Sequence, residues 1–285
     1  MKVPYAEVIG DPIIQSKSPV IHGFWLERLG ITGDYRRTHV KADGLADYLA
    51  TRRHDPDWRG CNVTMPHKQA VIALIDRLDP LAARIGAVNT IVPENGELVG
   101  YNTDAPGFLE PLRPLLDQTH YFRMARVLGT GGAARAIIAA LAGEGVVIVA
   151  AGRNVEKTRA LLDELDPAGE HHVAPLDHFA DATDFDFDDR EGCLDLVVNA
   201  SSLGMAGQPA LAFDMTHAPP GSVFYDIVTS PLETDFLKTA RDAGFGTVDG
   251  LSMLIGQADH AFRRFFGAVP PRGEADVELR ARLLA

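Results

Sequence analysis

A lysine and an aspartate in the first part of the chain stand where predicted strands end. Lys68 follows the β-branched segment 61–64, and Asp104 closes the segment 100–104, about one strand–helix unit downstream. An amine beside a carboxylate can move a proton to or from an oxygen atom of a small substrate. The sequence therefore predicts that Lys68 and Asp104 form an acid–base pair.

Hydroxyl and amide side chains gather at predicted strand ends and turns of the same region. They are Ser16, Ser18, Thr64 and Asn89. Such groups at the carboxyl ends of strands suit a ligand that carries several hydroxyl groups. Taken singly, Ser18 before Pro19 and Thr64 before Pro66 are equally explained as helix caps. Their number on converging loops favours a site for a polar small molecule.

A glycine-rich loop follows in a separate segment, between a predicted strand at 126–129 and a predicted helix at 132–143. Its residues are Gly129, Thr130, Gly131, Gly132 and Ala133. Glycine permits the tight turn and a close approach to a pyrophosphate, and the free N–H groups of a helix N-terminus favour an anion. The sequence therefore predicts a dinucleotide site in the second half of the chain.

The end of the next predicted strand, 146–150, indicates which dinucleotide binds. An NAD site usually has an acidic residue there for the ribose 2′-hydroxyl, whereas this chain continues with Gly152, Arg153 and Asn154. Arg153 and Lys157 offer cations to a 2′-phosphate, although Glu156 lies among them. We therefore expect NADP as the cofactor, with NAD as the alternative.

Composition narrows the class of protein. The chain has 285 residues with a formal net charge of −12, which disfavours nucleic acids and anionic membranes as partners. Two cysteines do not suggest a disulfide framework, the N-terminus lacks the apolar core of a secretory signal, and a cytoplasmic location is expected. No metal-binding spacing is found, and we interpret the acidic stretch 177–191 as a solvated loop.

The order of predicted elements indicates an α/β protein. Pro66 is expected at the first position of a helix that continues over 68–78, and Asn95–Gly96 predicts a hairpin, so the first sheet is expected to be mixed. Later apolar runs favour a parallel sheet covered on both faces, with Ser230–Pro231 opening a helix that ends at Gly244.

The motifs together resemble those of the shikimate dehydrogenase family over nearly the whole chain. The segments that carry the resemblance are 8–13, 16–19, 62–68, 87–90, 101–104, 129–133, 199–205, 225–228 and 250–254 with Gln257. The resemblance implies NADP-dependent, reversible reduction of 3-dehydroshikimate to shikimate, a step of chorismate and aromatic amino-acid biosynthesis. It also implies an N-terminal mixed-sheet substrate domain and a Rossmann-type NADP-binding domain. We expect the first at 1–104, joined by C-terminal helices at 251–285, and the second at 105–250.

The resemblance also implies residue roles. Lys68 and Asp104 correspond to the catalytic pair. The positions that hold shikimate in the family correspond here to Ser16, Ser18, Thr64, Lys68, Asn89, Asp104 and Gln257. The cofactor site of the family corresponds here to Gly129 to Ala133, Gly152, Arg153, Asn154, Lys157, Ile227 and Gly250.

Three positions depart from the family pattern. Gln15 stands where the family often has histidine, and Gly152 precedes Arg153 where asparagine is common. Thr229 stands where the family usually has a tyrosine that touches substrate, which leaves substrate affinity and preference among shikimate-like acids open. Two other functions remain as alternatives: an NAD-dependent quinate/shikimate dehydrogenase, and a non-catalytic regulator that senses NADP. We expect a monomer or a homodimer.

Overall fold

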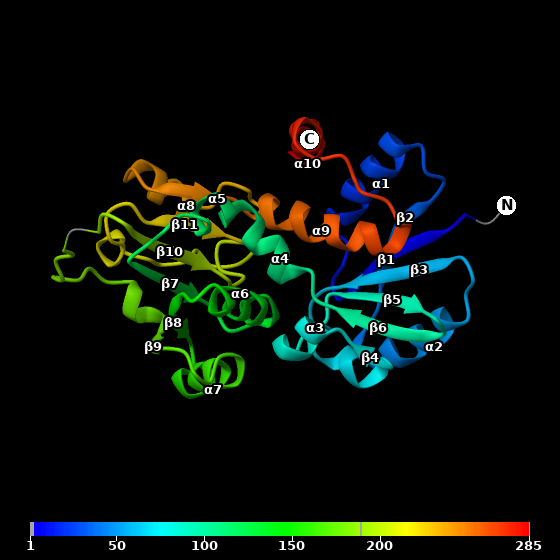
Figure 1. Ribbon diagram of the computed structural model, residues 1–285, viewed down its shortest axis with the longest axis horizontal. Coiled ribbons are helices and arrows are strands. Elements are labelled where there is room, and N and C mark those ends of the chain that lie inside the picture. The colour runs from blue at the N-terminus through cyan, green and yellow to red at the C-terminus, as the bar shows by residue number, and fades with distance from the viewer. Residues whose placement is uncertain (1–2, 189, 285) are drawn as a thin grey trace. The chain divides into compact units, whose positions relative to one another are not determined.

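The computed structural model describes residues 3–188 and 190–284. The chain divides into two compact units, the first formed by Met1–Gly107 with Leu254–Ala285 and the second by Phe108–Met253 (Figure 1). The functional domains expected from the sequence, with boundaries at 104/105 and 250/251, stay a prediction.

The first unit is built on a mixed sheet of six strands in the order β2-β1-β3-β5-β6-β4. Its strands are β1 (Tyr5–Gly10), β2 (Asp34–His39), β3 (Trp58–Val63), β4 (Arg77–Leu78), β5 (Thr90–Glu94) and β6 (Glu97–Tyr101). Its helices are α1 (Ser18–Leu29), α2 (Leu45–Arg53), α3 (Pro80–Ile85), most of α4 (Asp104–Leu109), most of α9 (Gly250–Phe266) and α10 (Glu274–Leu284). Strand β5 pairs antiparallel with both of its neighbours, β6 and β3.

The predicted hairpin is confirmed at the turn between β5 and β6. Asn95 and Gly96 both have positive φ, 53° and 87°, which is what a two-residue turn that follows the twist of the strands requires. The pairing runs from Glu94 opposite Glu97 to Thr90 opposite Tyr101. The hairpin therefore brings the two chain segments that flank it, at 89 and 102–104, to the same end of the sheet.

The helix predicted over 68–78 is wrong, and none begins at Pro66. Residues 66–69 form turns, a short 3₁₀ helix covers Ala70–Leu74, and Arg77–Leu78 forms strand β4. The backbone at 76–78 pairs with β6 at the edge of the sheet. There the Asp76 N–H donates to the Leu98 carbonyl at 3.0 Å. The Asp76 carboxylate also accepts from the Leu98 N–H at 2.6 Å, so pairing across the sheet replaces the helical hydrogen bonds.

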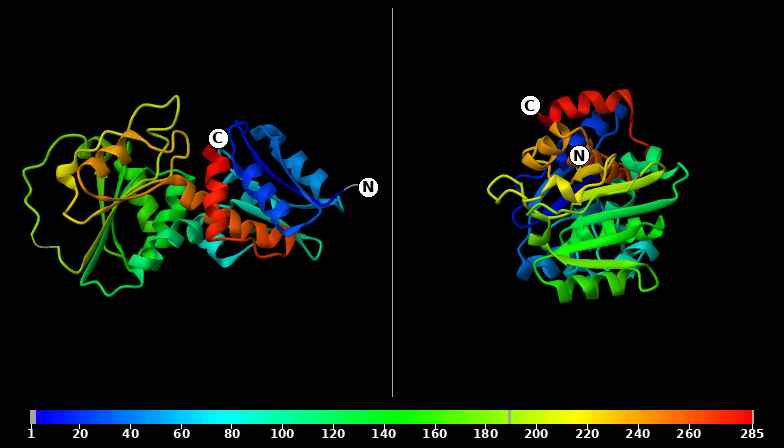
Figure 2. Two further views of the ribbon diagram at one scale, coloured as in Figure 1. Left: turned by 90° about the horizontal axis from the view of Figure 1, so that it is seen from above. Right: turned by 90° about the vertical axis from the view of Figure 1, so that its left-hand side faces the viewer.

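Apolar side chains cover both faces of β1, an inner strand next to the edge strand β2, and all of its residues are buried. Tyr5 and Ile9 belong to the core cluster beneath α2, whereas Ala6 and Val8 pack in the cluster that contains Phe265 of α9. Helix α10 lies beside α1, joined to it by ion pairs between Arg28 and Glu278 and between Arg282 and Glu27 (Figure 2). The C-terminal helices thus complete the packing of the first unit.

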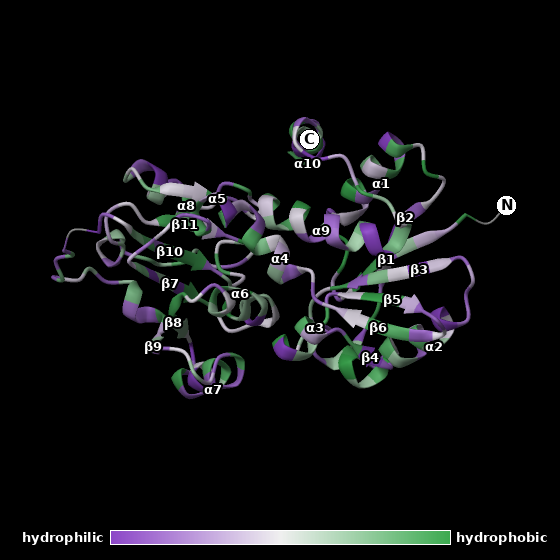
Figure 3. Ribbon diagram, in the orientation of Figure 1, coloured by the Kyte–Doolittle hydropathy of each residue, from purple (hydrophilic) through white to green (hydrophobic). Residues whose placement is uncertain are grey.

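The second unit contains six parallel strands in the order β12-β11-β10-β7-β8-β9. They are β7 (Phe122–Leu128), β8 (Val147–Gly152), β9 (His171–Pro175), β10 (Cys193–Asn199), β11 (Val223–Asp226) and β12 (Gly246–Val248). The helices are α5 (Arg113–Leu116), α6 (Gly132–Gly143), α7 (Val155–Leu165) and α8 (Asp235–Asp242). The order of the strands is that of a doubly wound dinucleotide-binding fold, whose ligands bind outside the carboxyl ends of the strands. Strands β8 and β10 are largely hydrophobic in Figure 3, as a sheet covered on both faces requires.

The helix predicted to open at Ser230–Pro231 begins later. Helix α8 starts at Asp235, and its N-cap is Thr234, whose hydroxyl accepts from the Leu237 N–H at 3.3 Å. The same hydroxyl donates to Asp226 Oδ2 at 2.7 Å, so a buried side-chain contact with the end of β11 sets the start of the helix. The prediction that Asn154 caps α7 is confirmed, because its side chain accepts from the Lys157 N–H at 2.9 Å.

Burial of His22 makes the stability of the first unit depend on pH. The ring is fully buried, stacks on Tyr35 at a centroid distance of 3.9 Å, and neither ring nitrogen has a hydrogen-bond partner among the described residues. Burial therefore lowers the pKa of His22 from 6.5 to about 3. The folded state keeps the ring neutral, while the unfolded chain takes up a proton below about pH 6.5, so stability falls as the pH drops below that value.

We expect His22 to cost about 2 kcal/mol of unfolding free energy when the pH falls from 8 to 5. His22→Phe, which keeps a ring of similar shape, should remove that part of the pH dependence. Urea unfolding of both proteins at several pH values measures the difference. Equal slopes of stability against pH would show that His22 titrates normally in the fold.

Candidate functional site

The two residues predicted to act as an acid–base pair lie in contact in the first unit, where the turn after β3 meets the start of α4. Lys68 Nζ donates to Asp104 Oδ2 at 2.6 Å. Asp104 Oδ1 accepts from Asn89 Nδ2 at 2.9 Å, so a different donor engages each carboxylate oxygen. The side chains of Lys68 and Asp104 are 15% and 8% exposed. The pair is therefore largely withdrawn from water but remains reachable from one side.

Asn89 is held so tightly that it fixes the carboxylate. Its N–H donates to the Tyr101 carbonyl at 3.0 Å, and its Oδ1 accepts from the Thr103 N–H at 2.7 Å. Thr103 also donates its hydroxyl hydrogen toward Gln257 Oε1 at 3.4 Å, and Gln257 Nε2 donates to the Leu254 carbonyl at 2.9 Å. The structure thus brings Gln257 of α9 to the same network as Asp104.

The predicted serines lie at the other end of this network, Ser16 in the connection from β1 to α1 and Ser18 at the first position of α1. Ser16 Oγ donates to Ser18 Oγ at 3.3 Å, and Ser18 is buried. Thr64 directly follows β3, where its N–H donates to the Ile9 carbonyl at 2.9 Å. Lys17 rather than Ser18 stands at the cap position of α1, and Thr64 precedes no α-helix, so neither side chain serves as a helix cap.

Residues without a predicted role connect the serines to the acid–base pair. The buried Tyr35 hydroxyl contacts Ser18 and donates to Asn62 Oδ1 at 2.5 Å, and burial raises the pKa of Tyr35 well above its usual range. Asn62 Nδ2 donates to Thr90 Oγ1 at 2.9 Å, and that hydroxyl donates to Asn89 Oδ1 at 3.0 Å. Asn62 and Thr90 belong to recognisable motifs, whereas no sequence signal points to Tyr35.

The glycine-rich loop of the second unit presents an uncapped helix N-terminus. The N-cap of α6 is Gly131, which has no side chain, and a Cβ added at this position would meet no atom within 4 Å. Gly129 has a φ of 128°, and a Cβ there would lie 2.8 Å from the Ala200 carbonyl carbon. The start of α6 thus has open space beside its cap residue and no side-chain cap, and a helix N-terminus of this kind suits a pyrophosphate.

The predicted phosphate turn follows β8. A Cβ at Gly152 would lie 2.4 Å from Thr158 Oγ1 and 2.8 Å from Thr130 Cγ2, so the turn packs directly against the glycine-rich loop. Arg153 and Lys157 are exposed, and neither forms an ion pair with a described residue. Their cationic groups are thus free to meet an added anionic group.

A third segment of the predicted cofactor site joins Ile227 to Gly250. A Cβ at Gly250 would lie 2.3 Å from the Val228 carbonyl oxygen, so only glycine permits this approach. Asp226 fixes the end of β11: its Oδ1 accepts from the Val228 N–H at 2.9 Å and from Asn199 Nδ2 at 3.0 Å. Burial raises the pKa of Asp226. Thr229 follows in the second unit, whereas the other predicted substrate residues lie in the first.

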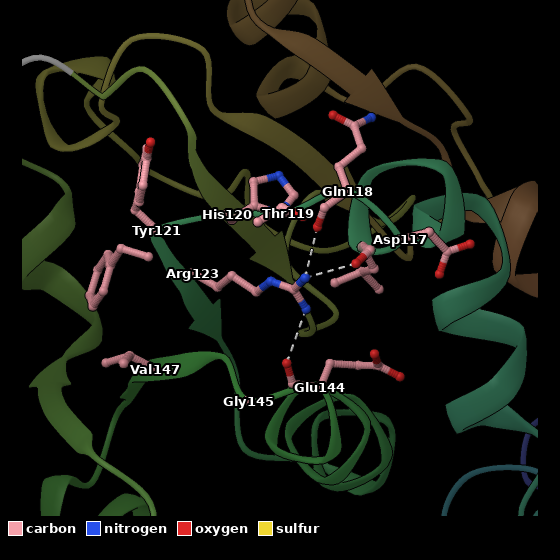
Figure 4. A pocket seen from close by; sticks show the side chains of 11 residues that line it. Asp117, Gln118, Thr119, His120, Tyr121, Arg123, Glu144, Gly145 and Val147 are labelled. Carbon is pink, nitrogen blue, oxygen red and sulfur yellow. Dashed lines mark hydrogen bonds between the residues drawn. The ribbon is translucent and has the colours of Figure 1, made fainter.

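A cavity of about 540 Å³ in the second unit contains none of the predicted site residues (Figure 4). Its central feature is Arg123, whose Nη2 donates to the carbonyls of Leu116 and Gln118 at 2.8 and 3.0 Å. Its Nη1 donates to the Glu144 carbonyl at 3.2 Å. The Arg123 guanidinium thus links the backbone at 116–118 to the backbone at 144. Because its donors are taken up by these carbonyls, we assign no binding function to this cavity.

Within residues 3–188 and 190–284, no three or more His, Cys, Asp or Glu side chains are grouped so that they could hold a metal ion. None of the helices in those ranges has the combined length and hydrophobicity that crossing a bilayer requires.

Comparisons with known proteins identify the relatives of this chain. Residues 8–91 match the family model for the shikimate dehydrogenase substrate binding domain. The NADP⁺-dependent shikimate dehydrogenase of Sphingopyxis alaskensis is 53% identical over 99% of this chain and 97% of its own length.

Two solved structures have the same fold over nearly the whole chain. The shikimate 5-dehydrogenase of Thermus thermophilus, in complex with NADP(H) and shikimate, has a TM-score of 0.80 at 34% identity, covering 99% of this chain and 100% of that one. The ligand-free 5-ketofructose reductase of a Gluconobacter strain has a TM-score of 0.83 at 27% identity, covering 100% and 98%.

The close approach of α4 to α9 can be tested at Gly107. A Cβ at this position would lie 2.4 Å from the Gln257 backbone nitrogen, which cannot move without displacing α9. We expect Gly107→Ala to destabilise the protein by about 1–3 kcal/mol, as overpacking usually does. Gly23→Ala in α1 is the matched control, because a Cβ there meets nothing within 4 Å. Thermal unfolding of both variants measures the effect, and equal melting temperatures would argue against the tight contact.

Proposed function

The chain belongs to the shikimate dehydrogenase family, and from this premise we propose that it catalyses the NADP-dependent, reversible reduction of 3-dehydroshikimate to shikimate. It is then an oxidoreductase that acts on a CH–OH group in chorismate and aromatic amino-acid biosynthesis. The observation that carries the proposal is the buried contact between Lys68 and Asp104, with Asn89 as a second donor to the carboxylate.

In the proposed reaction Lys68 moves the proton. During reduction its ammonium donates a proton to the oxygen of the ketone as negative charge develops there, and during oxidation the amine takes the proton back. Before it is transferred, the positive charge also stabilises the developing alkoxide. Asp104 orients the ammonium, and its second oxygen is held by Asn89, so the pair keeps one geometry through the reaction.

The polar network around this pair supplies the contacts for substrate. We assign Ser16, Ser18, Thr64, Asn89 and Gln257 to the hydroxyl and carboxylate groups of shikimate, and Thr229 as a further contact from the second unit. Tyr35, Asn62, Thr90 and Thr103 position these residues through the hydrogen bonds described above. The first unit is thus the substrate domain and the second the NADP domain.

The residues of the second unit fit a dinucleotide. The open space over Gly131 and the uncapped start of α6 accept a pyrophosphate, and Arg153 with Lys157 accept a 2′-phosphate. The remaining walls of this site are formed by Thr130, Gly132, Ala133, Gly152, Asn154, Ile227 and Gly250. When bound in its reduced form, the cofactor supplies the hydride for the carbonyl carbon.

The free cationic side chains after β8 support NADP over NAD. The named relatives of this chain that use NADP support the same choice. Following NADPH absorbance with shikimate, quinate and 5-ketofructose as separate substrates, and with NAD in place of NADP, tests the assignment. Cofactor binding without turnover of any of them would instead support a regulator.

The location and assembly of the enzyme are further proposals. Both cysteines, Cys61 and Cys193, are free thiols, which supports a reducing, cytoplasmic compartment. The net charge of −12 supports small molecules rather than nucleic acids or anionic membranes as partners. We propose a monomer or a homodimer.

Removing the amine should abolish most of the turnover but little of the binding. We expect Lys68→Ala to lower kcat by about 10²–10⁴-fold, the usual contribution of a general acid–base group. Steady-state assays give kcat, and calorimetric titration with shikimate gives affinity separately. Lys41→Ala, an exposed lysine of the same unit, is the control. Turnover by Lys68→Ala close to that of the unaltered enzyme would remove Lys68 from the chemistry.

Removing the Arg153 guanidinium should affect one cofactor selectively. We expect Arg153→Leu to raise the KM for NADP about 10–100-fold, as loss of charge-assisted hydrogen bonds does, and to leave the KM for NAD nearly unchanged. NAD thereby serves as the internal control, because it lacks the 2′-phosphate. An equal rise for both cofactors would mean that Arg153 supports the fold of the turn rather than the phosphate.

A further inference from the structure

A second cavity, of about 470 Å³, lies within the second unit, away from the glycine-rich loop. We call it the Arg126 cavity. Its lining residues come from the middle of β7, β8 and β9 and from the segments around 178–187 and 217; those used below are Arg126, His172, His178, Phe179, Phe185, Phe187 and His217. None of them belongs to the proposed substrate or NADP site.

Arg126 is a buried cation with too few acceptors. It is 9% exposed, and its Nη1 makes no hydrogen bond with any residue in the described ranges. The nearest carboxylate oxygen is Asp195 Oδ1, with which Nη1 forms an ion pair at 3.6 Å; at this distance the two atoms make no hydrogen bond, and Asp195 Oδ1 is likewise without a hydrogen-bond partner among the described residues. The other oxygen, Asp195 Oδ2, already accepts from Arg190 at 2.7 and 3.0 Å. Burial accordingly lowers the pKa of Arg126.

A guanidinium has five N–H donors, and burying it without acceptors is costly. Arg126 and Arg190 share the Asp195 carboxylate, so the two guanidinium groups carry more positive charge than this partner balances. An anion in the cavity would supply the missing acceptor to Arg126 Nη1. The structure therefore favours a ligand with at least one carboxylate-like group.

The other side chains that line the cavity indicate the chemical nature of the rest of the ligand, beyond its anionic group. Phe179, Phe185 and Phe187 supply aromatic surface, and the Arg126 guanidinium lies 5.7 Å from the centroid of the Phe187 ring. His172, His178 and His217 add planar rings with polar edges; the ring centroids of His178 and His217 lie 5.2 Å apart. Asp184 and Asp186, which alternate with the two loop phenylalanines, are exposed to solvent. Ring surfaces around a cation that shares its only carboxylate partner among the described residues with a second arginine suit a flat, apolar body.

We propose that the Arg126 cavity is a second ligand site, which binds a small aromatic carboxylate. The carboxylate accepts from Arg126, and the ring packs among the phenylalanine and histidine side chains. The volume lies within the range of small-molecule sites. This inference does not depend on the proposed enzyme activity, because no residue of the cavity takes part in it.

Benzoate is the first probe, titrated calorimetrically into the full chain in the presence of saturating shikimate. Shikimate is included because its own site could also take a carboxylate. We expect one equivalent of benzoate to bind, and benzyl alcohol and inorganic phosphate to bind at least tenfold more weakly. Benzoate binding that shikimate abolishes, no binding of benzoate, or equal binding of phosphate would each overturn the proposal.

Two substitutions with opposite expected signs test the role of Arg126. Arg126→Met should weaken benzoate at least tenfold, whereas Asp195→Asn, which removes the competing carboxylate, should strengthen it severalfold. A merely structural Arg126–Asp195 pair would make both substitutions destabilising and neither favourable to binding. Arg241→Met, which removes an exposed arginine of the same unit, should leave benzoate affinity unchanged. Should Arg126→Met fail to fold, the sign of the Asp195→Asn effect decides, and unchanged or weaker binding overturns the proposal.

Discussion

The interaction on which the first unit depends is the two-sided hold on the Asp104 carboxylate. A buried carboxylate is costly unless its charge is paired and its oxygen atoms accept hydrogen bonds. Here an ammonium contacts one oxygen and an amide contacts the other. The amide is itself fixed through its carbonyl oxygen by the Thr103 N–H. Because Asn89 is held by backbone groups on both sides, the Asp104 oxygen that it contacts has little freedom to move.

Backbone contacts that only glycine permits complete this arrangement in both units. Gly107 lets α4 approach the backbone of Gln257, and Gly250 lets the start of α9 approach the Val228 carbonyl. Gly10 lies so close to Thr64 that a Cβ would be 2.5 Å from its Cγ2. In each case the missing side chain decides where a predicted site residue stands, although the glycine itself does no chemistry.

The sequence predicts well what depends on neighbouring residues. The Asn95–Gly96 turn, the cap at Asn154 and the parallel sheet all follow from local geometry or composition, and the structure confirms them. The helix over 68–78 fails because pairing with β6 lies outside any local window. The same limit hides Tyr35, since only the order of the strands brings β2 within reach of Ser18 and Asn62.

The β5–β6 hairpin has a consequence for how the Asp104 carboxylate and its amide donor, Asn89, come together during folding and vary in evolution. Asn89 and Asp104 flank the hairpin at its open end, whereas Asn95 and Gly96 form its tip. The two partners therefore meet through contacts between residues close in the chain, with little loop-closure entropy to overcome. Lengthening the tip leaves the open end in register, so this turn is a place where insertions can accumulate without disturbing the contact between Asn89 and Asp104.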